Sequence, residues 1–408
     1  MHARPAAPRA LPDRRARPLP NRPPGALANR LPRERGWDEG RPRIALRPPD
    51  ALLVGSVAFL VMLGLVMVYS ASSAIGYQYY HDTAHYLKHQ LAYLVVGLGF
   101  AYAAYRIDYR KLRALAPALV VITSALLVLT LIPHVGFATG GARRWLGFRA
   151  LSFQPSELAK LAVVLFLAAR LTQLGEKVRS LSKGVIPALL VTAMLAVPIL
   201  IEPDMGTASL LVFTAFAMLF AAGARIEHLI MSALAVLPPA ALEVGASAYK
   251  RARIFAFINP WKDAQNTGFH IVQSLLALGS GGIFGVGLGQ SRQKYFYLPE
   301  AHTDFIFAVL GEELGLLGCI AVIALFVLFA VRAIQLSLQA PDRFGMLLAL
   351  GCTFTIVIQA FVNVGVVTSS WPVTGVPLPF ISFGGTSLIV SLIAVALIAN
   401  VGRYRAIS

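Results

Sequence analysis

Long apolar runs separated by short polar stretches dominate the chain from residue 51 onward. A run of more than about 18 apolar residues is long enough to cross a bilayer as a helix. The pattern predicts ten membrane-spanning helices, at residues 52–74, 87–105, 115–133, 157–174, 185–201, 206–222, 228–246, 305–331, 344–367 and 384–402. We therefore expect an all-α polytopic membrane protein with a large outer loop, at about residues 247–303, between helices seven and eight.

A further segment, residues 271–289, is also apolar and long enough to span, but six glycines from residue 279 onward weaken it as a helix. A crossing here would place the basic C-terminal tail outside and the uncharged loop 368–383 inside. That arrangement opposes the excess of Lys and Arg that cytoplasmic loops carry. We therefore expect a helix that lies on, or dips into, the outer membrane face, and both chain termini in the cytoplasm.

Composition and charge agree with this interpretation. The chain is 57% hydrophobic and 13% charged, whereas a soluble domain has about a quarter of its residues charged. Its net charge of +17 is concentrated in the N-terminal tail and the loops, where Lys and Arg set orientation and meet anionic headgroups. We expect no nucleic-acid partner. Residues 1–50 hold 11 of the 25 prolines, which predicts a disordered basic cytoplasmic tail before a transmembrane domain at 51–408.

Charged groups at membrane depth are costly and usually functional, and five polar clusters interrupt the apolar pattern. In "GARRWLGF", Arg143, Arg144 and Trp145 either anchor an outer loop among headgroups or bind an anion such as pyrophosphate. In "QPSELAK", Glu157 and Lys160 share one helix face. They form either a structural ion pair or a substrate contact.

Two more clusters bring carboxylates to the starts of helices. In "EPDMGT", Asp204 either caps the helix that follows or lines a cavity. In "SRQKYFYLPEAHTDF", Lys294 supplies positive charge, and Glu300, His302 and Asp304 supply acid–base groups. Asp304 alone is equally well explained as a cap of the next helix, but a cap explains neither the imidazole nor the neighbouring cations.

The fifth cluster, "VTGVPLPFISFGGTS" at residues 373–387, contains Ser382 as a candidate substrate contact. An irregular backbone at this depth survives only where protein or a water-filled cavity covers it, so we expect a hairpin packed over a cavity. Together the five clusters predict one polar cavity that opens to the outer face. A lipid-linked phosphate fits it, and a carboxylate beside cations fits proton abstraction from a hydroxyl.

These motifs, with "YSASS" at 69–73 and "GEELG" at 311–315, resemble the family of shape, elongation, division and sporulation (SEDS) proteins over nearly the whole chain from residue 51. These are the peptidoglycan glycosyltransferases of the FtsW and RodA type. The stretch "QKYFYLPEAHTDFIFAV" is more similar to the division branch, FtsW, than to the elongation branch, RodA. A sporulation paralogue of the SpoVE type stays open. The resemblance implies ten transmembrane helices and polymerisation of lipid II at the outer face of the bacterial cytoplasmic membrane, at the division septum.

The same resemblance implies a mechanism. Asp304 matches the family's essential aspartate, and it would take the proton from the 4-hydroxyl of an acceptor GlcNAc. That oxygen would attack C1 of the donor MurNAc on the nascent glycan carried by undecaprenyl pyrophosphate. Arg143, Arg144, Lys160 or Lys294 would stabilise the leaving pyrophosphate. A divalent cation, Mg²⁺ or Mn²⁺, would share that role, although no ligand spacing requires one.

The partners that the resemblance implies are a class B penicillin-binding protein, which is the cross-linking transpeptidase, and the regulatory membrane proteins of the divisome. Two other classes of function stay open. A lipid II flippase would need polar groups along a whole path across the membrane, whereas these clusters gather on one face. A scaffold that only recruits partners would tolerate substitution of Asp304.

Overall fold

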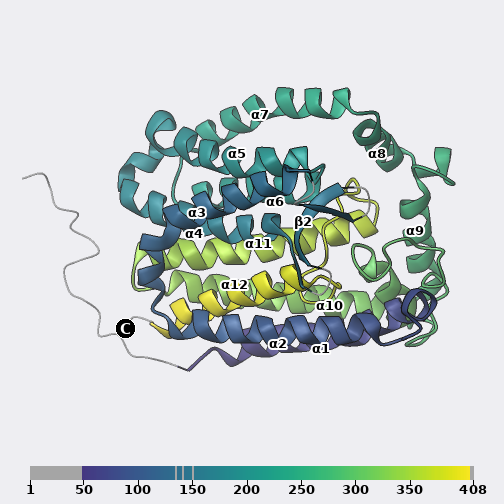
Figure 1. The fold of residues 1–408 in the computed structure, drawn as a ribbon. Helices are drawn as coiled ribbons and strands as arrows, with labels where there is room; N and C mark the ends of the chain where they lie inside the picture. Colours follow the sequence, from purple (N-terminus) through teal and green to yellow (C-terminus); the bar gives the residue numbers. More distant parts are fainter. Residues whose placement is uncertain (1–47, 134–135, 140–141, 149–150, 405–408) are drawn as a thin grey trace, which may run out of the picture. The chain divides into compact units, whose positions relative to one another are not determined.

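The computed structural model describes residues 48–404 except 134–135, 140–141 and 149–150. Each of the ten predicted spans is a helix in this structure (Figure 1). The ten helices are α1 (Ala51–Tyr80), α2 (His85–Arg106), α3 (Tyr109–Leu131), α4 (Pro155–Leu174), α5 (Ile186–Ile201), α6 (Met205–Ala221), α7 (Ile226–Ala246), α10 (Ile306–Leu338), α11 (Arg343–Val367) and α12 (Gly385–Arg403). The polytopic helical architecture is thus confirmed.

Seven helical spans in the described part of the chain are long and apolar enough to cross a membrane. They correspond to α1, α3, α4, α5, α10, α11 and α12. Helices α2, α6 and α7 do not meet that criterion, so the count of ten membrane crossings stays a prediction. Helix α1 has 30 residues and α10 has 33, and both are longer than the apolar run that predicted them.

The centre of the bundle is formed by α11 and α12. They lie between α1 and α2 on one side and α3 to α6 on the other (Figure 1). In their most apolar windows, 72% of α11 and 83% of α12 is buried, against 28% of α3. Peripheral helices can leave apolar side chains exposed because lipid is their solvent.

The large outer loop contains the helices α8 (Ala248–Ile258), η3 (Pro260–Asp263) and α9 (Phe269–Gly281). Helix α9 has 13 residues, so it is about 20 Å long and too short to cross the hydrocarbon core of about 30 Å. Its glycine-rich continuation is not helical. The expectation that residues 271–289 do not form a full crossing is therefore met.

That continuation packs against a break in α10. Gly315 has φ 68° and ψ −166°, which is not helical. The N–H of Leu316 donates to the carbonyl of Gly282 at 2.9 Å, and the N–H of Val286 donates to the carbonyl of Glu312 at 3.0 Å. The backbone groups that the break releases are thus paired within the protein, as burial in a membrane requires.

A small antiparallel sheet follows α3 and was not predicted. Its strands are β1 (Phe137–Thr139), β2 (Ala142–Phe148) and β3 (Leu151–Phe153), in the order β1-β2-β3. Trp145 pairs with Phe137, and Leu146 pairs with Phe153. The sheet holds the arginine pair of "GARRWLGF" in an ordered strand where the sequence indicated a loop.

Candidate active site

Asp304 lines a cavity of about 210 Å³ between the outer loop and the hairpin that precedes α12. The polar side chains of its wall are Arg253, Asn266, Thr267, His270, Glu300 and Asp304. Arg253 belongs to α8 and His270 to α9, while Val373 and Gly375 of the hairpin close the opposite wall. Asp304 is partly buried, and its carboxylate is the candidate reactive group.

The expected alternative role of Asp304, as the cap of α10, is wrong in this structure. Helix α10 begins at Ile306, its N-cap residue is Phe305, and no side chain caps it. Asp204 does cap its helix, because its carboxylate accepts from the N–H of Thr207 at 3.0 Å. The two aspartates therefore differ, and only Asp304 keeps its carboxylate for the cavity.

Burial, together with the negative charges of Glu300 and Asp204, raises the pKa of Asp304 to about 7. The positive charges of Arg253 and Arg144 oppose that rise in pKa. A general base works best when its pKa lies near the operating pH, and perturbed carboxylates are concentrated at functional sites. The surroundings of Asp304 thus suit proton abstraction near neutral pH.

The hairpin at residues 373–384 is fastened to the segment that carries Asp304. The hydroxyl of Ser382 donates to the carbonyl of Thr303 at 2.6 Å and accepts from the N–H of Leu378 at 2.8 Å. The N–H of Phe383 donates to the carbonyl of His302 at 2.9 Å. Ser382 is therefore a positioning residue in this structure, and its direct contact with substrate stays a prediction.

Glu300 and His302 have different surroundings although they are two residues apart. Glu300 is exposed, lines the cavity, and accepts from the hydroxyl of Thr303 at 2.8 Å. His302 is buried, with its ring 4.6 Å from that of Tyr86 and 5.8 Å from that of Phe383. Burial lowers the pKa of His302, so its ring packs as a neutral imidazole.

Glu157 and Lys160 form a buried ion pair, with 2.6 Å between Oε2 and Nζ. Lys160 also donates to the side-chain oxygen of Gln359 at 2.7 Å, and Gln359 donates to the carbonyl of Pro377 at 2.8 Å. The pair does not line the cavity. It connects α4 through α11 to the hairpin, so it supports the wall opposite Arg253.

The arginine strand lies against the link between α5 and α6. Arg144 donates to the carbonyls of Glu202 at 3.0 Å and Pro203 at 2.6 Å. Arg143 is exposed and Trp145 is partly buried. Burial raises the pKa of Glu202 to about 7. The strand thus places one guanidinium beside Asp204 and leaves another exposed.

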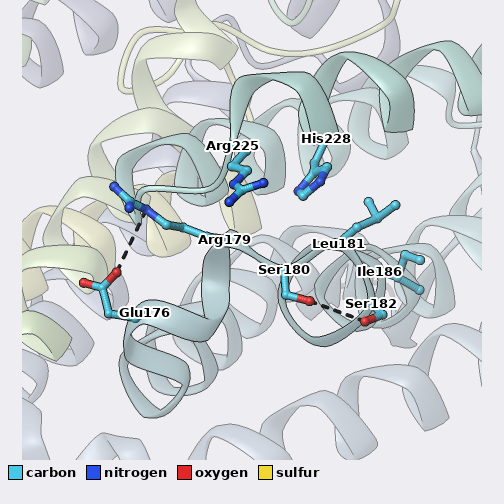
Figure 2. A pocket seen from close by; sticks show the side chains of 8 residues that line it. All are labelled: Glu176, Arg179, Ser180, Leu181, Ser182, Ile186, Arg225 and His228. Atoms are coloured by element: carbon cyan, nitrogen blue, oxygen red, sulfur yellow. Dashed lines mark hydrogen bonds and ion pairs between the residues drawn. The ribbon is translucent and has the colours of Figure 1, made fainter.

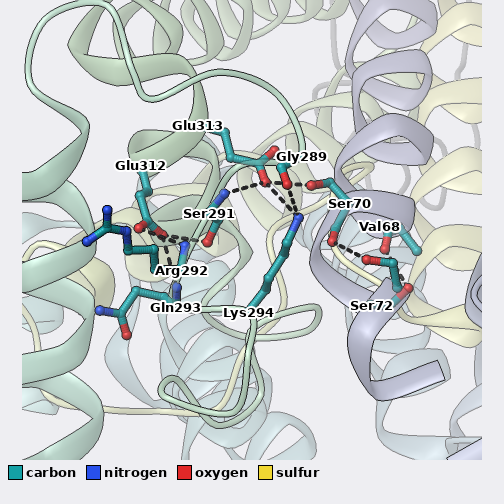
Figure 3. A network of polar contacts seen from close by, with 11 residues as sticks. Val68, Ser70, Ser72, Gly289, Ser291, Arg292, Gln293, Lys294, Glu312 and Glu313 are labelled. Carbon is teal, nitrogen blue, oxygen red and sulfur yellow. Dashed lines mark hydrogen bonds and ion pairs between the residues drawn. The ribbon is translucent and has the colours of Figure 1, made fainter. Parts of the chain in front are cut away.

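Lys294 is buried away from the cavity. Its Nζ lies 3.7 Å from the carboxylate of Glu313, which also accepts from the hydroxyl of Ser70 at 2.5 Å (Figure 3). The neighbouring carboxylate of Glu312 accepts from the hydroxyl of Ser291 at 2.5 Å and from the N–H of Arg292 at 3.0 Å. This network holds the loop that leads to Asp304.

Sequence reasoning missed four polar side chains of the cavity: Arg253, Asn266, Thr267 and His270. Arg253 lies in the basic stretch "KRARIF" of α8 and donates to the carbonyl of Val373 at 3.3 Å. The ring of His270 is stacked 5.7 Å from that of Phe305. Its Nδ1 is buried without a hydrogen-bond partner among the described residues. The basic stretch was the available signal for Arg253.

The structure thus places Glu300, Asp304 and Arg253 in one cavity wall, while the charges of Asp204 and Arg144 act on the pKa of Asp304 from outside that wall. The other candidates support the surrounding backbone or lie outside the cavity wall. Their roles toward a substrate stay predictions. Within the described residues, no group of three or more His, Cys, Asp and Glu side chains is placed to hold a metal ion.

Comparison with known proteins gives a consistent result. The family model described as "Cell cycle protein", for FtsW, RodA and SpoVE, matches residues 50–407. This chain belongs to that family. It is 45% identical to the probable peptidoglycan glycosyltransferase FtsW of Geobacter metallireducens over 352 residues, which is 86% of this chain and 94% of the relative. It is 44% identical to stage V sporulation protein E of Bacillus subtilis over 356 residues, or 87% and 97% of the two chains.

Solved structures agree with the family assignment. One similar chain comes from work on the structural coordination of polymerization and crosslinking by a peptidoglycan synthase complex. It is 32% identical, has a TM-score of 0.72, and the match covers 87% of this chain and 98% of that one. RodA of Thermus thermophilus is 30% identical with a TM-score of 0.63, and the match covers 88% and 98%.

Proposed function

We propose that this protein is a peptidoglycan glycosyltransferase that polymerises lipid II into β-1,4-linked glycan strands at the outer face of the cytoplasmic membrane. Relatives named for this activity match 86% of the chain. The observation that carries the proposal is the carboxylate of Asp304, which is set in a cavity with its pKa raised to about 7.

In the reaction, Asp304 takes the proton from the 4-hydroxyl of the acceptor GlcNAc. The oxygen attacks C1 of the donor MurNAc with inversion, the bond from C1 to the pyrophosphate breaks, and undecaprenyl pyrophosphate leaves. Arg144 and Arg253, the two cations that lower the pKa of Asp304, stabilise the developing negative charge. In this proposal the cavity receives the reacting ends of the two glycans, and the lipid tails stay in the bilayer.

The expected Mg²⁺ or Mn²⁺ belongs to the substrate in this proposal. Mg²⁺ usually binds through one or two carboxylates together with substrate phosphates, not in a cage built by the protein alone. Titration of metal-depleted protein with Mg²⁺ or Mn²⁺ in the polymerisation assay tests this requirement.

The deciding experiment measures lipid II polymerisation by purified protein in detergent, where no transport across a membrane can occur. Wild type should form glycan polymer. Asp304→Asn should be slower by about 10²- to 10⁴-fold, which is the usual contribution of a general base. Asp108→Asn, at the start of α3 and outside the cavity, is the control, since Asn can keep the cap. Polymer formation by Asp304→Asn at the wild-type rate overturns the base assignment. If wild-type protein forms no polymer even with its partner present, the result supports a flippase.

We assign the activity to cell division, with the protein at the septum and both termini in the cytoplasm. The FtsW name of several relatives supports division, while the similarity to stage V sporulation protein E keeps a sporulation role as the alternative outcome. Depletion should yield filaments with blocked septa. Rounded cells would indicate elongation, and a defect confined to spores would indicate sporulation.

The proposed partners are a class B penicillin-binding protein, which cross-links the new strand, and regulatory membrane proteins of the divisome. Similarity to a chain of a synthase complex that combines polymerization and crosslinking supports the first. Polymerisation with and without the cognate transpeptidase measures whether the partner activates the enzyme.

A further inference from the structure

A second cavity, of about 660 Å³ and widely open to its surroundings, lies where α4 is linked to α5 and α7 begins. Its polar wall consists of Glu176, Arg179, Ser180, Ser182, Arg225 and His228 (Figure 2). Helix α4 has 20 residues, so this cavity is about 30 Å along that helix from the end near Glu157. It is separate from the Asp304 cavity, and the predicted orientation places it at the cytoplasmic face.

The backbone at this cavity is unusual for a short connection. The link consists of a 3₁₀-helix, η1 (Gly175–Arg179), and a π-helix, η2 (Leu181–Val185). A π-helical turn is rare and frequently occurs at a functional site. Gly184 packs so closely that a Cβ atom there would lie 2.4 Å from the carbonyl oxygen of Val178. The two turns are therefore folded against each other and present Ser180 and Ser182 to the cavity.

The cations of the cavity have little negative charge to balance them. Arg179 lies 4.0 Å from Glu176, and their side chains are 67% and 90% exposed, so the pair is worth little. In the described part of the chain, no carboxylate lies within ion-pair distance of Arg225. The Nδ1 atom of His228 is buried without a hydrogen-bond partner among those residues. Figure 2 shows Arg225 and His228 side by side at the start of α7, while the Arg179 side chain extends from the link toward Glu176.

These groups match the chemistry of a phosphate. A guanidinium presents a planar fork of donors that suits phosphate oxygens, and the two serine hydroxyls add donors. The cavity is much larger than one phosphate, and Leu181 and Ile186 supply an apolar part of its wall. Basic pockets between transmembrane helices at the cytoplasmic face bind anionic lipid headgroups. We propose that this cavity binds the phosphate of an anionic phospholipid of the inner leaflet.

The position of the cavity gives the lipid a structural effect. The main contacts of helix α7 with the rest of the described chain are those with α6, α8 and η2. Arg225 and His228 lie at the start of α7, whereas Arg179 lies in the α4–α5 link. A phosphate between them bridges the two elements. Because α7 leads into α8, which carries Arg253, the bound lipid also steadies the helix that lines the outer cavity.

The test uses the full-length protein, delipidated in detergent, with three probes: dioleoylphosphatidylglycerol, dioleoylphosphatidylcholine and inorganic phosphate. Native mass spectrometry measures binding, and thermal unfolding measures stabilisation. The pocket variant is Arg179→Ala with Arg225→Ala. The matched control is Lys177→Ala with Lys183→Ala, which removes the same number of positive charges, both from the α4–α5 link and both outside the cavity wall. We expect at least tenfold weaker phosphatidylglycerol binding by the pocket variant, and wild-type binding by the control.

Equal weakening in both variants overturns the proposal, because general charge would then explain the binding. Equal affinity of wild type for the two lipids also overturns it. Inorganic phosphate that binds more tightly than phosphatidylglycerol overturns the lipid source and assigns the cavity to a soluble phosphate. If the pocket variant does not fold, Arg225→Gln alone provides the same comparison with Lys183→Gln as its control.

Discussion

The side-chain amide of Asn363 donates to the backbone carbonyl of Asp304 at 2.7 Å and to the carbonyl of Val376 at 2.8 Å. One buried amide on α11 therefore holds both the residue with the candidate catalytic carboxylate and the hairpin that faces it. The carboxylate of Asp304 takes no part in these hydrogen bonds and remains available in the cavity. Asn363 thus fixes the position of Asp304 without taking part in proton transfer.

Replacing Asn363 with Leu should impair catalysis because Asp304 would no longer be held in position. Two buried carbonyls lose their donor, at about 1–3 kcal/mol each in folding stability. We expect kcat to fall at least tenfold while the midpoint of the pH–rate profile stays unchanged, because the amide does not titrate. Thermal unfolding and polymerisation kinetics measure the two effects.

The control for Asn363 is Asn400→Leu. Asn400 is equally buried, and its amide donates to carbonyls at the end of α2, including that of Ala104 at 2.7 Å. It should cost similar stability but leave kcat nearly unchanged below the unfolding temperature. Equal loss of kcat in both variants would show that the effect of Asn363 is general destabilisation.

The pH dependence of polymerisation should follow Asp304. With its pKa raised to about 7, the base is protonated and inactive below that pH, and activity should rise to a plateau above it. Glu300→Gln removes a negative charge that raises this pKa, so the midpoint should move to lower pH. The shift should be smaller than about one unit, because charge effects of exposed groups are screened.

The measurement is the midpoint of kcat/KM against pH, not the absolute rate, because Glu300 lines the cavity. Glu227→Gln removes an equal charge from the exposed first turn of α7 and should leave the midpoint in place. A midpoint that moves upward in Glu300→Gln would contradict the electrostatic assignment.

The sequence predicted the helices well because lipid demands apolar residues on nearly every surface of a spanning helix. The apolar runs therefore marked ten of the described α-helices, α1 to α7 and α10 to α12. The strand that carries Arg143 and Arg144 was missed because its residues do not alternate between apolar and polar and its partner strands have three residues each. Alternation of apolar and polar residues cannot identify strands as short as these.

The candidate site could be located from sequence but not resolved into roles. The sequence identified Asp304, Glu300 and Asp204 as candidates from their places near the ends of helices. It also predicted Lys294 as a cation of the cavity, whereas in the structure Lys294 is paired with Glu313. The hydroxyl of Ser70 that completes this network is 243 residues away from Glu313 in the chain. Contacts between buried residues so far apart in the chain cannot be predicted from the local sequence. The orientation of α8 toward Asp304 cannot be predicted from it either.

Breaking the buried ion pair of α4 should be strongly destabilising. Lys160→Met leaves Glu157 buried without its cation, which costs about 3–5 kcal/mol when one partner of such a pair is removed. The double variant Lys160→Met with Glu157→Leu should recover most of that stability, since an apolar pair can replace a buried ion pair. Thermal unfolding of the two variants checks this difference.

Activity should not recover with stability in that double variant. Gln359 loses the ammonium that orients it, so its hydrogen bond to the hairpin at Pro377 is no longer directed. We expect a loss of kcat of several fold at a temperature where the protein is folded. Full recovery of both stability and kcat would mean that the pair serves packing alone.

The break in α10 depends on glycine at position 315. The φ of 68° is strained for any other residue, and a Cβ atom there would lie 2.3 Å from the backbone N of Gly285 and 2.5 Å from the carbonyl oxygen of Ile283. Both clashes involve backbone, which cannot move aside as a side chain can. Gly315→Ala should therefore separate the 282–287 segment from α10 and yield protein that is aggregated or inactive.

The control is Gly55→Ala, in α1, where the Cβ position has open space. This variant should keep wild-type folding and polymerisation, because Ala favours the helix by about 1 kcal/mol over Gly. Fluorescence-detected size-exclusion chromatography of the two variants gives the comparison, and a monodisperse, active Gly315→Ala would show that the break does not require glycine.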